Sequence, residues 1–497
     1  MNALQNIIKD SSLTYEQRVL ALARYAENQL DVLKLSEEAQ RLREEGVICD
    51  LYEGNAPYRP RYIVPNYEKF VNQGSEFLEL EPPKDLDDLL NKLLILYKHV
   101  PSISSFPVYI GNLDYLIEPF LGEIEKDYKK IKNFMLHIDR TITDSFCHGN
   151  IGPKATKAGE LILRAQRELN TSIPNLTLKY NQDTTSKKFL EDSLETAMIT
   201  AKPSFANDHM FKDEFEGDYA IASCYNGLKI AGGSFTLVRL VLKKLADQTD
   251  DYDRFIEKLL PNAVQKQLEY MDERIRFLVE ETSFFESNFL VREGLIDFKN
   301  FTAMFGLVGL AETVNKFSDK RFGHDQSADE MGVEIIDLIN TLVNQHENKY
   351  CEAFDGKFLL HAQVGIDDDI GVSPGCRIPI GEEPDLASHL KQVSRFQKYF
   401  PSGIGDIFPF EKTYKENIPA LVNIVDGAIK NDIRYLSLYS SDSDVIRISG
   451  YLVKRSEIEK LRNGSPVLRD TVVLGKGAVD HMKVLDRKVQ GNVWFWR

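Results

Sequence analysis

Apolar residues recur at helical spacing through much of the first quarter of the chain, which predicts a mainly helical region. The run Thr14-Tyr15-Glu16-Gln17 fits a capping box, and helical spacing continues from there until Gly46 stops the helix. Two further helices are expected over 85–99 and 122–137. The segment 57–65 carries three prolines, so we expect an ordered loop that packs on the surface rather than a helix.

From about Arg140 onward, short apolar runs alternate with helical segments, which is typical of α/β folds. The expected strands cover 173–180, 218–224, 234–240, 358–364 and 433–439, and the expected helices cover 187–200, 251–285, 301–317, 326–346, 386–396 and 414–431. A polar loop is expected at 202–209 and a loop rich in glycine, proline and aspartate at 365–384. The pattern predicts an N-terminal helical region at 1–139, an α/β core at 140–438 and a C-terminal segment at 439–497.

Charge and hydropathy narrow the classes of partner. The net charge of −15 and the isoelectric point near 5.3 leave no basic surface for phosphate groups, so nucleic acid is not an expected partner. The longest apolar runs reach about half of the length that a membrane span needs, and residues 1–13 lack the features of a signal peptide. We therefore expect a cytoplasmic protein without a membrane partner.

Cysteine usage points to reduced thiols. The five cysteines are widely spaced, odd in number and form no Cys-x-x-Cys pair, which argues against a disulfide framework or a zinc ribbon. The chain also lacks the Gly-x-x-x-x-Gly-Lys-Ser/Thr and Gly-x-Gly-x-x-Gly loops that bind phosphates.

One glycine near the C-terminus interrupts a β-rich run. Gly450 lies within 445–453, where a strand favours residues with side chains, and a bulge or a close backbone approach is the ordinary explanation. A chemical explanation is the alternative. Loss of a hydrogen atom from a glycine Cα leaves a radical that the flanking amide nitrogen and carbonyl stabilise if the centre flattens, and only a residue without Cβ flattens without steric cost. Such a glycine needs a partner cysteine.

Four motifs resemble, in the same order along the chain, those of the glycyl radical enzymes. They are the strand 174–179 (Pro-Asn-Leu-Thr-Leu-Lys), the loop 203–208 (Pro-Ser-Phe-Ala-Asn-Asp), the strand 218–224 (Asp-Tyr-Ala-Ile-Ala-Ser-Cys) and the signature 447–451 (Arg-Ile-Ser-Gly-Tyr). In the third motif the family carries its reactive cysteine, here Cys224, and in the fourth its radical glycine, here Gly450. The chain is identified as a member of this family, and its short length resembles the YjjI-type branch.

The resemblance implies a ten-stranded α/β barrel, formed by 140–438, with an N-terminal helical layer and two finger loops that meet at the centre of the barrel. Gly450, in the glycyl radical segment 439–497, would store the radical and generate a thiyl radical on Cys224, which abstracts hydrogen from a small polar metabolite. The resemblance further implies an external activating enzyme of the radical S-adenosylmethionine class, which holds the iron–sulfur cluster. It implies no metal in the mature enzyme and leaves a homodimer open.

Departures from better-known members narrow the reaction. Cys224 is flanked by Ser223 and Tyr225, whereas pyruvate formate-lyase uses two adjacent cysteines, so relay to coenzyme A is not expected. Dehydratases and amine lyases of the family carry Cys-x-Glu, and here Asn226 takes the place of the carboxylate base. The four-cysteine zinc site of anaerobic ribonucleotide reductases is missing, although the runs 234–240 and 305–310 resemble the reductase core.

Two alternatives to a glycyl radical enzyme with a distinct reaction stay open. One is an activity like that of the anaerobic ribonucleotide reductases. The other is a non-catalytic protein of the same fold, or one that donates a radical domain to a damaged partner enzyme. The intact strand before Cys224 favours an enzyme.

Further candidates for the substrate pocket lie on two loops. These candidates are Asn207, Asp208 and His209 before the cysteine strand and Arg377 on the late loop. Their ordinary explanations are turn chemistry for the first three and an ion pair for the arginine. Cys147 and Cys376 are candidate redox partners of Cys224, with a buried inert thiol as the ordinary explanation.

Overall fold

The computed structural model describes residues 3–51, 53–101, 106–142, 146–365, 369, 371–448, 451–474 and 477. Its strands are β1 (Ile48–Cys49), β2 (Tyr62–Val64), β3 (Tyr109–Asn112), β4 (His148–Ile151), β5 (Asn175–Tyr180), β6 (Ser204–Asn207), β7 (Tyr219–Ala222), β8 (Asn226–Lys229), β9 (Gly232–Val241), β10 (Phe301–Val308), β11 (Leu359–Ala362), β12 (Asp406–Phe410), β13 (Tyr435–Ser440), β14 (Val445–Ile448) and β15 (Tyr451–Lys454).

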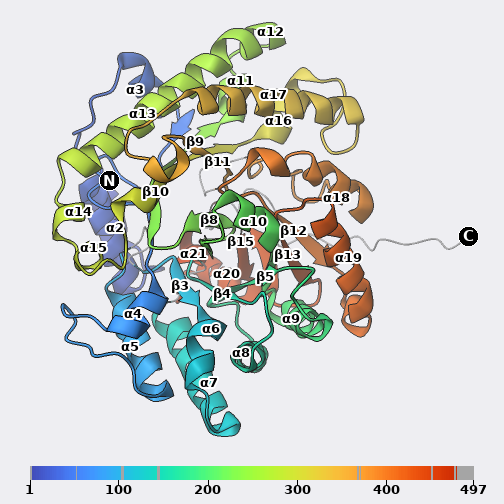
Figure 1. Cartoon of the computed structure of the whole chain (residues 1–497). Helices are drawn as coiled ribbons and strands as arrows, with labels where there is room; N and C mark the ends of the chain where they lie inside the picture. Colours follow the sequence, from blue (N-terminus) through green and yellow to red (C-terminus); the bar gives the residue numbers. More distant parts are fainter. Residues whose placement is uncertain are drawn as a thin grey trace, which may run out of the picture.

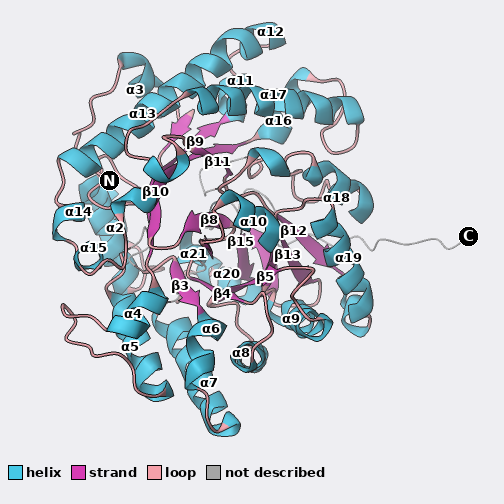
Figure 2. Cartoon of the chain, viewed as in Figure 1, coloured by secondary structure: helices cyan, strands magenta, loops and turns pink. Residues whose placement is uncertain are grey.

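The α-helices are α1 (Ala3–Lys9), α2 (Tyr15–Glu27), α3 (Glu37–Glu44), α4 (Tyr67–Gln73), α5 (Leu86–Lys98), α6 (Leu113–Ile117), α7 (Ile124–Thr141), α8 (Lys157–Leu169), α9 (Lys187–Thr200), α10 (Asp208–Glu214), α11 (Leu242–Ala246), α12 (Tyr252–Arg254), α13 (Leu260–Glu280), α14 (Phe284–Ser287), α15 (Phe289–Arg292), α16 (Leu310–Phe317), α17 (Gln326–Gln345), α18 (Leu386–Ser394), α19 (Ile418–Lys430), α20 (Arg455–Arg462) and α21 (Asp470–Leu474). Most of them surround the strands, which occupy the middle of the molecule (Figure 2). Within the described residues, no helix combines the length and the apolar content that a membrane crossing requires.

The larger sheet has the strand order β12-β13-β6-β5-β4-β3. Strands β3 to β6 are parallel to one another, β13 is antiparallel to β6, and β12 is parallel to β13. Every residue of β4, β5 and β6 is buried, as expected for parallel strands that are covered on both faces.

The second sheet has the order β1-β9-β10-β11, with β2 also paired to β9. Strands β9, β10 and β11 are parallel, and helix α13 packs against β9. An isolated parallel bridge joins His361 of β11 to Gly403, just before β12, so the two sheets approach each other there. Strands β1 and β2 bring residues of the N-terminal region into this sheet.

Two short antiparallel hairpins complete the β-structure, β7 with β8 and β14 with β15. Strand β7 contacts β3 and β4 of the larger sheet, and β8 contacts β9 of the second sheet. In Figure 1, β8 and β15 lie in the middle of the molecule between the two sheets. The chain thus directs two hairpins from distant parts of the sequence towards one interior region.

Several elements differ from the sequence-based expectation. The capping box at Thr14 is present, with reciprocal hydrogen bonds to Gln17, but the helix ends at Glu27 and a second helix, α3, begins after the capping residue Ser36. The residues 202–209 were expected to form a loop and instead contain β6, followed by the start of α10.

The expected helix at 301–317 is a strand followed by a helix. Strand β10 is buried at all eight positions and so has no alternation of apolar and polar residues by which to distinguish it from a buried helix. The segment 57–65 contains β2, whose three residues are buried against β9.

Candidate functional site

Cys224 lies at the turn of the β7–β8 hairpin. Ala222 pairs with Asn226 across the hairpin, so residues 223–225 form the turn. Ser223 and Cys224 have φ angles of 47° and 83°, in the left-handed region that residues with a Cβ adopt at an energetic cost. Contacts from the surrounding strands must therefore hold the turn in this conformation.

Groups from three directions supply those contacts. The Cys224 main-chain N–H donates to the imidazole of His148 in β4, at 3.2 Å. The Tyr225 hydroxyl donates to the carbonyl oxygen of Ala362 in β11. Gly403 approaches the turn so closely that a Cβ there would lie 2.4 Å from the Tyr225 carbonyl oxygen, so a glycine is needed. Burial, together with Lys202, holds the pKa of His148 well below its ordinary value, so its imidazole is neutral and can accept this hydrogen bond.

The strand before the cysteine is fixed as firmly as the turn. The Asn150 side chain in β4 both accepts from the N–H of Ile221 and donates to its carbonyl oxygen, at 2.9 Å each. Lys179 in β5 donates to the Tyr219 carbonyl oxygen at 2.7 Å and lies over the Tyr219 ring. The Tyr219 hydroxyl in turn donates to Asp208 at 2.7 Å.

A second buried lysine lies near the cysteine. Lys202, just before β6, is 5% exposed, and its ammonium group donates to the Ser204 hydroxyl at 3.0 Å. Burial lowers the pKa of Lys202 to about 8, an effect that Cys224 partly opposes. The Ser204 hydroxyl is also 2.7 Å from the hydroxyl of Ser437 in β13.

The candidates of the first loop have separate roles. Asn207 caps α10, and its amide donates to the carbonyl oxygens of α19 and the following turn. Asp208 is fully buried, accepts from Tyr219, and forms an ion pair with Lys212. The side chain of His209 is half exposed and lies 3.2 Å from the exposed Asp183, so it is not among the groups that surround Cys224.

Arg377 lies beside the cysteine hairpin. It is buried, donates to the Gly405 carbonyl oxygen at 2.7 Å, and its guanidinium lies over the Tyr225 ring at 5.5 Å. Its Nε is also 3.5 Å from Asp406. Of the two candidate redox cysteines, Cys147 is buried, and burial raises the pKa of the Cys376 thiol, as in inert buried thiols.

The predicted radical glycine falls between the strands of the C-terminal hairpin. Ile448 of β14 pairs with Tyr451 of β15, and Ser449 and Gly450 lie outside the described residues. Arg447, the arginine of the signature motif, is buried and lies 3.4 Å from both Asp406 of β12 and Glu383. These ion pairs attach the hairpin to the larger sheet.

One hydrophobic cluster joins the two hairpins. It contains Tyr219, Ile221 and Tyr225 from the cysteine hairpin together with Ile448 from β14, and Cys224 packs against it. Strand β15, the two helices that follow and the loop between them contribute Val453, Ile458, Leu461, Val467 and Val472. The residue two positions before Gly450 therefore packs in the cluster on which Cys224 lies.

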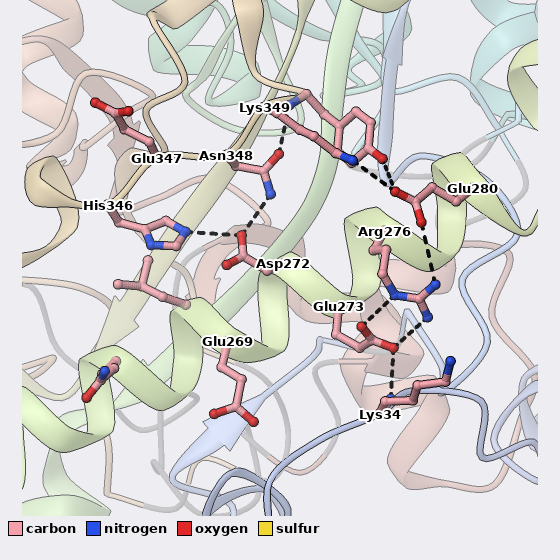
Figure 3. A pocket seen from close by; sticks show the side chains of 13 residues that line it. Lys34, Glu269, Asp272, Glu273, Arg276, Glu280, His346, Glu347, Asn348 and Lys349 are labelled. Atoms are coloured by element: carbon pink, nitrogen blue, oxygen red, sulfur yellow. Dashed lines mark hydrogen bonds and ion pairs between the residues drawn. The ribbon is translucent and has the colours of Figure 1, made fainter.

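A surface groove of about 730 Å³ lies on the outside of the molecule, along α13 (Figure 3). Its charged groups are mostly satisfied by each other: Arg276 pairs with Glu273, and Asp272 accepts from His346 and Asn348. We interpret it as a polar surface network and assign no site to it.

Sequence reasoning assigned no site role to several residues that lie around the cysteine hairpin. These are His148, Asn150, Lys179 and Lys202, with Tyr435, whose ring packs 5.7 Å from that of Tyr225. Lys202 directly precedes a motif that the sequence does reveal, and this position was the available signal. His148 and Asn150 lie in a strand, β4, whose polar residues hid it from a search for apolar runs.

Comparison with known proteins places these features in a class. The fold matches solved structures of glycyl radical enzymes over most of the chain. The anaerobic ribonucleotide reductase of Thermotoga maritima, in complex with dATP and CTP, aligns with a TM-score of 0.64 and 13% identity, covering 93% of this chain and 91% of the reductase. A structure concerned with 1,2-propanediol dehydration in Roseburia inulinivorans aligns with a TM-score of 0.68 and 10% identity, covering 98% and 88%. The expected α/β class is confirmed, with neighbours that have an α/β barrel fold, while the closure of the barrel and the count of ten strands stay predictions.

Sequence comparison identifies the branch. The model of the family described as "Glycyl radical enzyme YjjI-like" matches residues 13–490. A protein of Haemophilus influenzae is 46% identical over 502 residues, covering 98% of each chain, and the YjjI protein of Escherichia coli is 42% identical over 493 residues, covering 97% and 95%. The chain belongs to the YjjI-like family of glycyl radical enzymes.

Proposed function

We propose that this glycyl radical enzyme stores its radical on Gly450 and transfers it to Cys224, which then acts on a small polar metabolite. The observation that supports the proposal is the shared hydrophobic cluster, which contains Ile448 of the C-terminal hairpin as well as Tyr225 of the cysteine turn. Family membership supports the radical chemistry, and the shared cluster supports Cys224 as the partner of Gly450.

Each step transfers one hydrogen atom. The Gly450 radical takes the hydrogen of the Cys224 thiol, so an S–H bond breaks, a C–H bond forms and the unpaired electron moves to sulfur. The thiyl radical then takes a hydrogen atom from a carbon of the substrate and re-forms the S–H bond. After rearrangement the product radical recovers that hydrogen from the thiol. The thiyl radical then takes a hydrogen atom from the Gly450 Cα, so the C–H bond breaks, the S–H bond re-forms and the radical is again on Gly450.

The surroundings of Cys224 suit this chemistry because they are buried and fixed. His148 of β4 and Ala362 of β11 hold the turn by hydrogen bonds, and Asn150 of β4 holds the strand before it. Cys224 itself is partly exposed, as a thiol that must reach a substrate requires. Asn226, in the position of a catalytic glutamate in the family's dehydratases, is buried, and its amide cannot accept a proton at neutral pH.

Formation of the radical requires an external partner, because no side chain can oxidise the glycine unaided. The partner we expect is a radical S-adenosylmethionine enzyme that carries an iron–sulfur cluster. Chemistry of this difficulty belongs to cofactors rather than to side chains.

The test uses hydrogen exchange at the radical and needs no known substrate. A glycyl radical keeps one Cα hydrogen, whose coupling splits its electron paramagnetic resonance signal into a doublet. In D₂O the Cys224 thiol becomes S–D, so reversible transfer introduces deuterium at Gly450 and the doublet collapses. Cys224→Ser should form the radical and keep its doublet in D₂O. Cys351→Ser, at a buried thiol, should lose the doublet as the wild type does. Collapse at the wild-type rate in Cys224→Ser would remove Cys224 from the mechanism.

A further inference from the structure

The ammonium group of Lys202 lies at a row of hydroxyl groups on the larger sheet. Its ammonium group donates to Ser204 in β6 at 3.0 Å, and Ser204 lies 2.7 Å from the hydroxyl of Ser437 in β13. On the other side of β6, Thr177 of β5 is in register with Ser204. The Tyr435 hydroxyl of β13 lies close to the hydroxyls of Ser204, Thr177 and Ser437. The Tyr435 ring packs against that of Tyr225, next to Cys224.

The charge of Lys202 lacks a counter-charge in the described part of the chain. No carboxylate there lies within ion-pair distance of its ammonium group, and the titratable groups that interact with it are Cys224 and the neutral His148. An isolated buried ammonium is costly, and folded proteins normally pair it.

Lys179, on the adjacent strand β5, shows what a compensated lysine looks like in the same sheet. It is similarly buried, but it donates to a main-chain carbonyl oxygen, lies 4.1 Å from the centre of the Tyr219 ring, and interacts with the charges of Asp208, Asp114 and Asp218. Lys179 therefore has a structural role in holding the cysteine hairpin, which Lys202 does not share.

Unused hydrogen-bonding capacity surrounds Lys202. Within the described residues, neither the buried Tyr435 hydroxyl nor the buried Thr177 hydroxyl makes a hydrogen bond of good geometry, although the Tyr435 hydroxyl lies close to those of Ser204, Thr177 and Ser437. Buried polar groups without well-placed partners are rare, and two of them close to one uncompensated cation indicate a ligand that completes the set. The ligand must supply negative charge and hydrogen-bond acceptors.

We propose that the substrate of this enzyme carries an oxyanion group, a carboxylate or a phosphate, that is bound by Lys202 with the hydroxyls of Ser204, Ser437 and Tyr435. An ammonium group with hydroxyl donors matches the lone pairs of an oxyanion in charge and geometry. The inference rests on the proposed function in one respect, which is that the rest of the substrate would face Cys224. Binding of the oxyanion itself needs no radical.

The test is therefore made on the full-length chain without activation. Acetate and inorganic phosphate serve as probes, and nuclear magnetic resonance line broadening of each probe gives its dissociation constant. Hydrogen bonds to charged groups contribute about 1.5–3 kcal/mol, so Lys202→Met should weaken binding about 10- to 100-fold. Lys202→Arg should retain most of the affinity, and Lys187→Met, at a lysine that is 71% exposed, should match the wild type.

The two probes distinguish the source of the oxyanion. Binding of phosphate alone that depends on Lys202 indicates a phosphorylated substrate, and such binding of acetate indicates a carboxylate. Equal binding by the wild type and Lys202→Met overturns the proposal, as does no binding of either probe. Neither of these binding results affects the deuterium-exchange test of Cys224. Oxyanion binding at Lys202 and radical transfer to Cys224 can therefore be refuted separately.

A measurement on wild-type protein guards against a Lys202→Met chain that does not fold. Acetate keeps its charge above neutral pH, so its affinity should fall about tenfold per pH unit once Lys202 begins to lose its proton, near pH 8. Burial raises the pKa of Tyr435 to about 12 and keeps His148 neutral, which leaves Cys224 as the other titrating neighbour. The same fall in Cys224→Ser supports Lys202, and an affinity that does not change between pH 7 and 10 contradicts it.

Discussion

Replacing Arg447 by methionine should release the C-terminal hairpin while the rest of the molecule stays folded. Arg447 is 2% exposed, and its guanidinium lies 3.4 Å from Asp406, from Glu383 and from the carbonyl oxygen of Ile407. Burial alone raises the pKa of Asp406, but Arg447, His389 and Arg377 lower it well below its ordinary value. Asp406 is therefore ionised at neutral pH and needs its positively charged partners.

The magnitude follows from what remains after the substitution. Removing one partner of a buried ion pair costs about 3–5 kcal/mol. Asp406 keeps His389 at 2.9 Å and Arg377 at 3.5 Å, so we expect the lower end of that range, about 3 kcal/mol. Because the loss concerns only the attachment of the hairpin, the equilibrium for local opening should increase about 100-fold.

Amide hydrogen exchange followed by mass spectrometry measures this opening. Peptides that cover 445–454 should exchange about 100-fold faster in Arg447→Met, and peptides from β5 should not change. Lys460→Met, at an exposed lysine on α20 in the same segment, is the matched control. If the hairpin keeps its protection from exchange, or if β5 loses as much protection as the hairpin, then Arg447 does not attach the hairpin locally. If activation requires the segment from about Tyr439 to swing out, the variant should also reach its full radical signal sooner.

Two further outcomes are expected. Activated protein exposed to air should be cut next to Gly450, because dioxygen adds to the backbone radical, giving fragments that end near Ser449 and at Arg497 on a denaturing gel; Gly450→Ala should give neither radical nor cut, and cleavage at another glycine would contradict the assignment. Lys202→Met should stabilise the protein at pH 7 by up to about 3 kcal/mol, since burial lowers the pKa of Lys202 from 10.5 to about 8 and each pKa unit corresponds to about 1.4 kcal/mol. Between pH 8 and 10.5 the unfolded chain binds more protons at Lys202 than the folded chain does, so the wild type gains stability as the pH rises. The difference in free energy of unfolding between Lys202→Met and the wild type, measured by urea unfolding, should therefore shrink over this range. A variant that is less stable than the wild type at pH 7 would contradict this.

The sequence predicted the elements whose local signals agree with their surroundings. The expected helix at 187–200 has those bounds as α9, because Ser186 caps its first turn and its apolar face packs inward. The motif that ends on Cys224 predicted a short strand followed by the cysteine, as observed. The left-handed conformation of Ser223 and Cys224 was not predictable, since neither is a glycine and distant strands impose it.

Strand β10 shows why the period of the apolar pattern does not always distinguish a strand from a helix. A parallel strand covered on both faces is apolar at nearly every position, so it has neither the alternation of a surface strand nor the polar face of a surface helix. The sequence did contain a boundary signal in Gly309, whose φ of 83° separates β10 from α16. A glycine between two apolar runs is better interpreted as a junction than as an interior helical residue.

The two lysines near the cysteine hairpin define the limit of sequence reasoning about the site. Lys179 ends one motif that the sequence reveals and Lys202 directly precedes another. Both are buried, and burial lowers the pKa of each to about 8. They differ only in partners that come from distant strands: acidic groups and a carbonyl oxygen surround Lys179, while hydroxyls surround Lys202. An interior that balances one such charge with its own carboxylates and leaves the other unbalanced is arranged to receive negative charge from a ligand. That difference, which arises only on folding, gives the oxyanion hypothesis its physical basis.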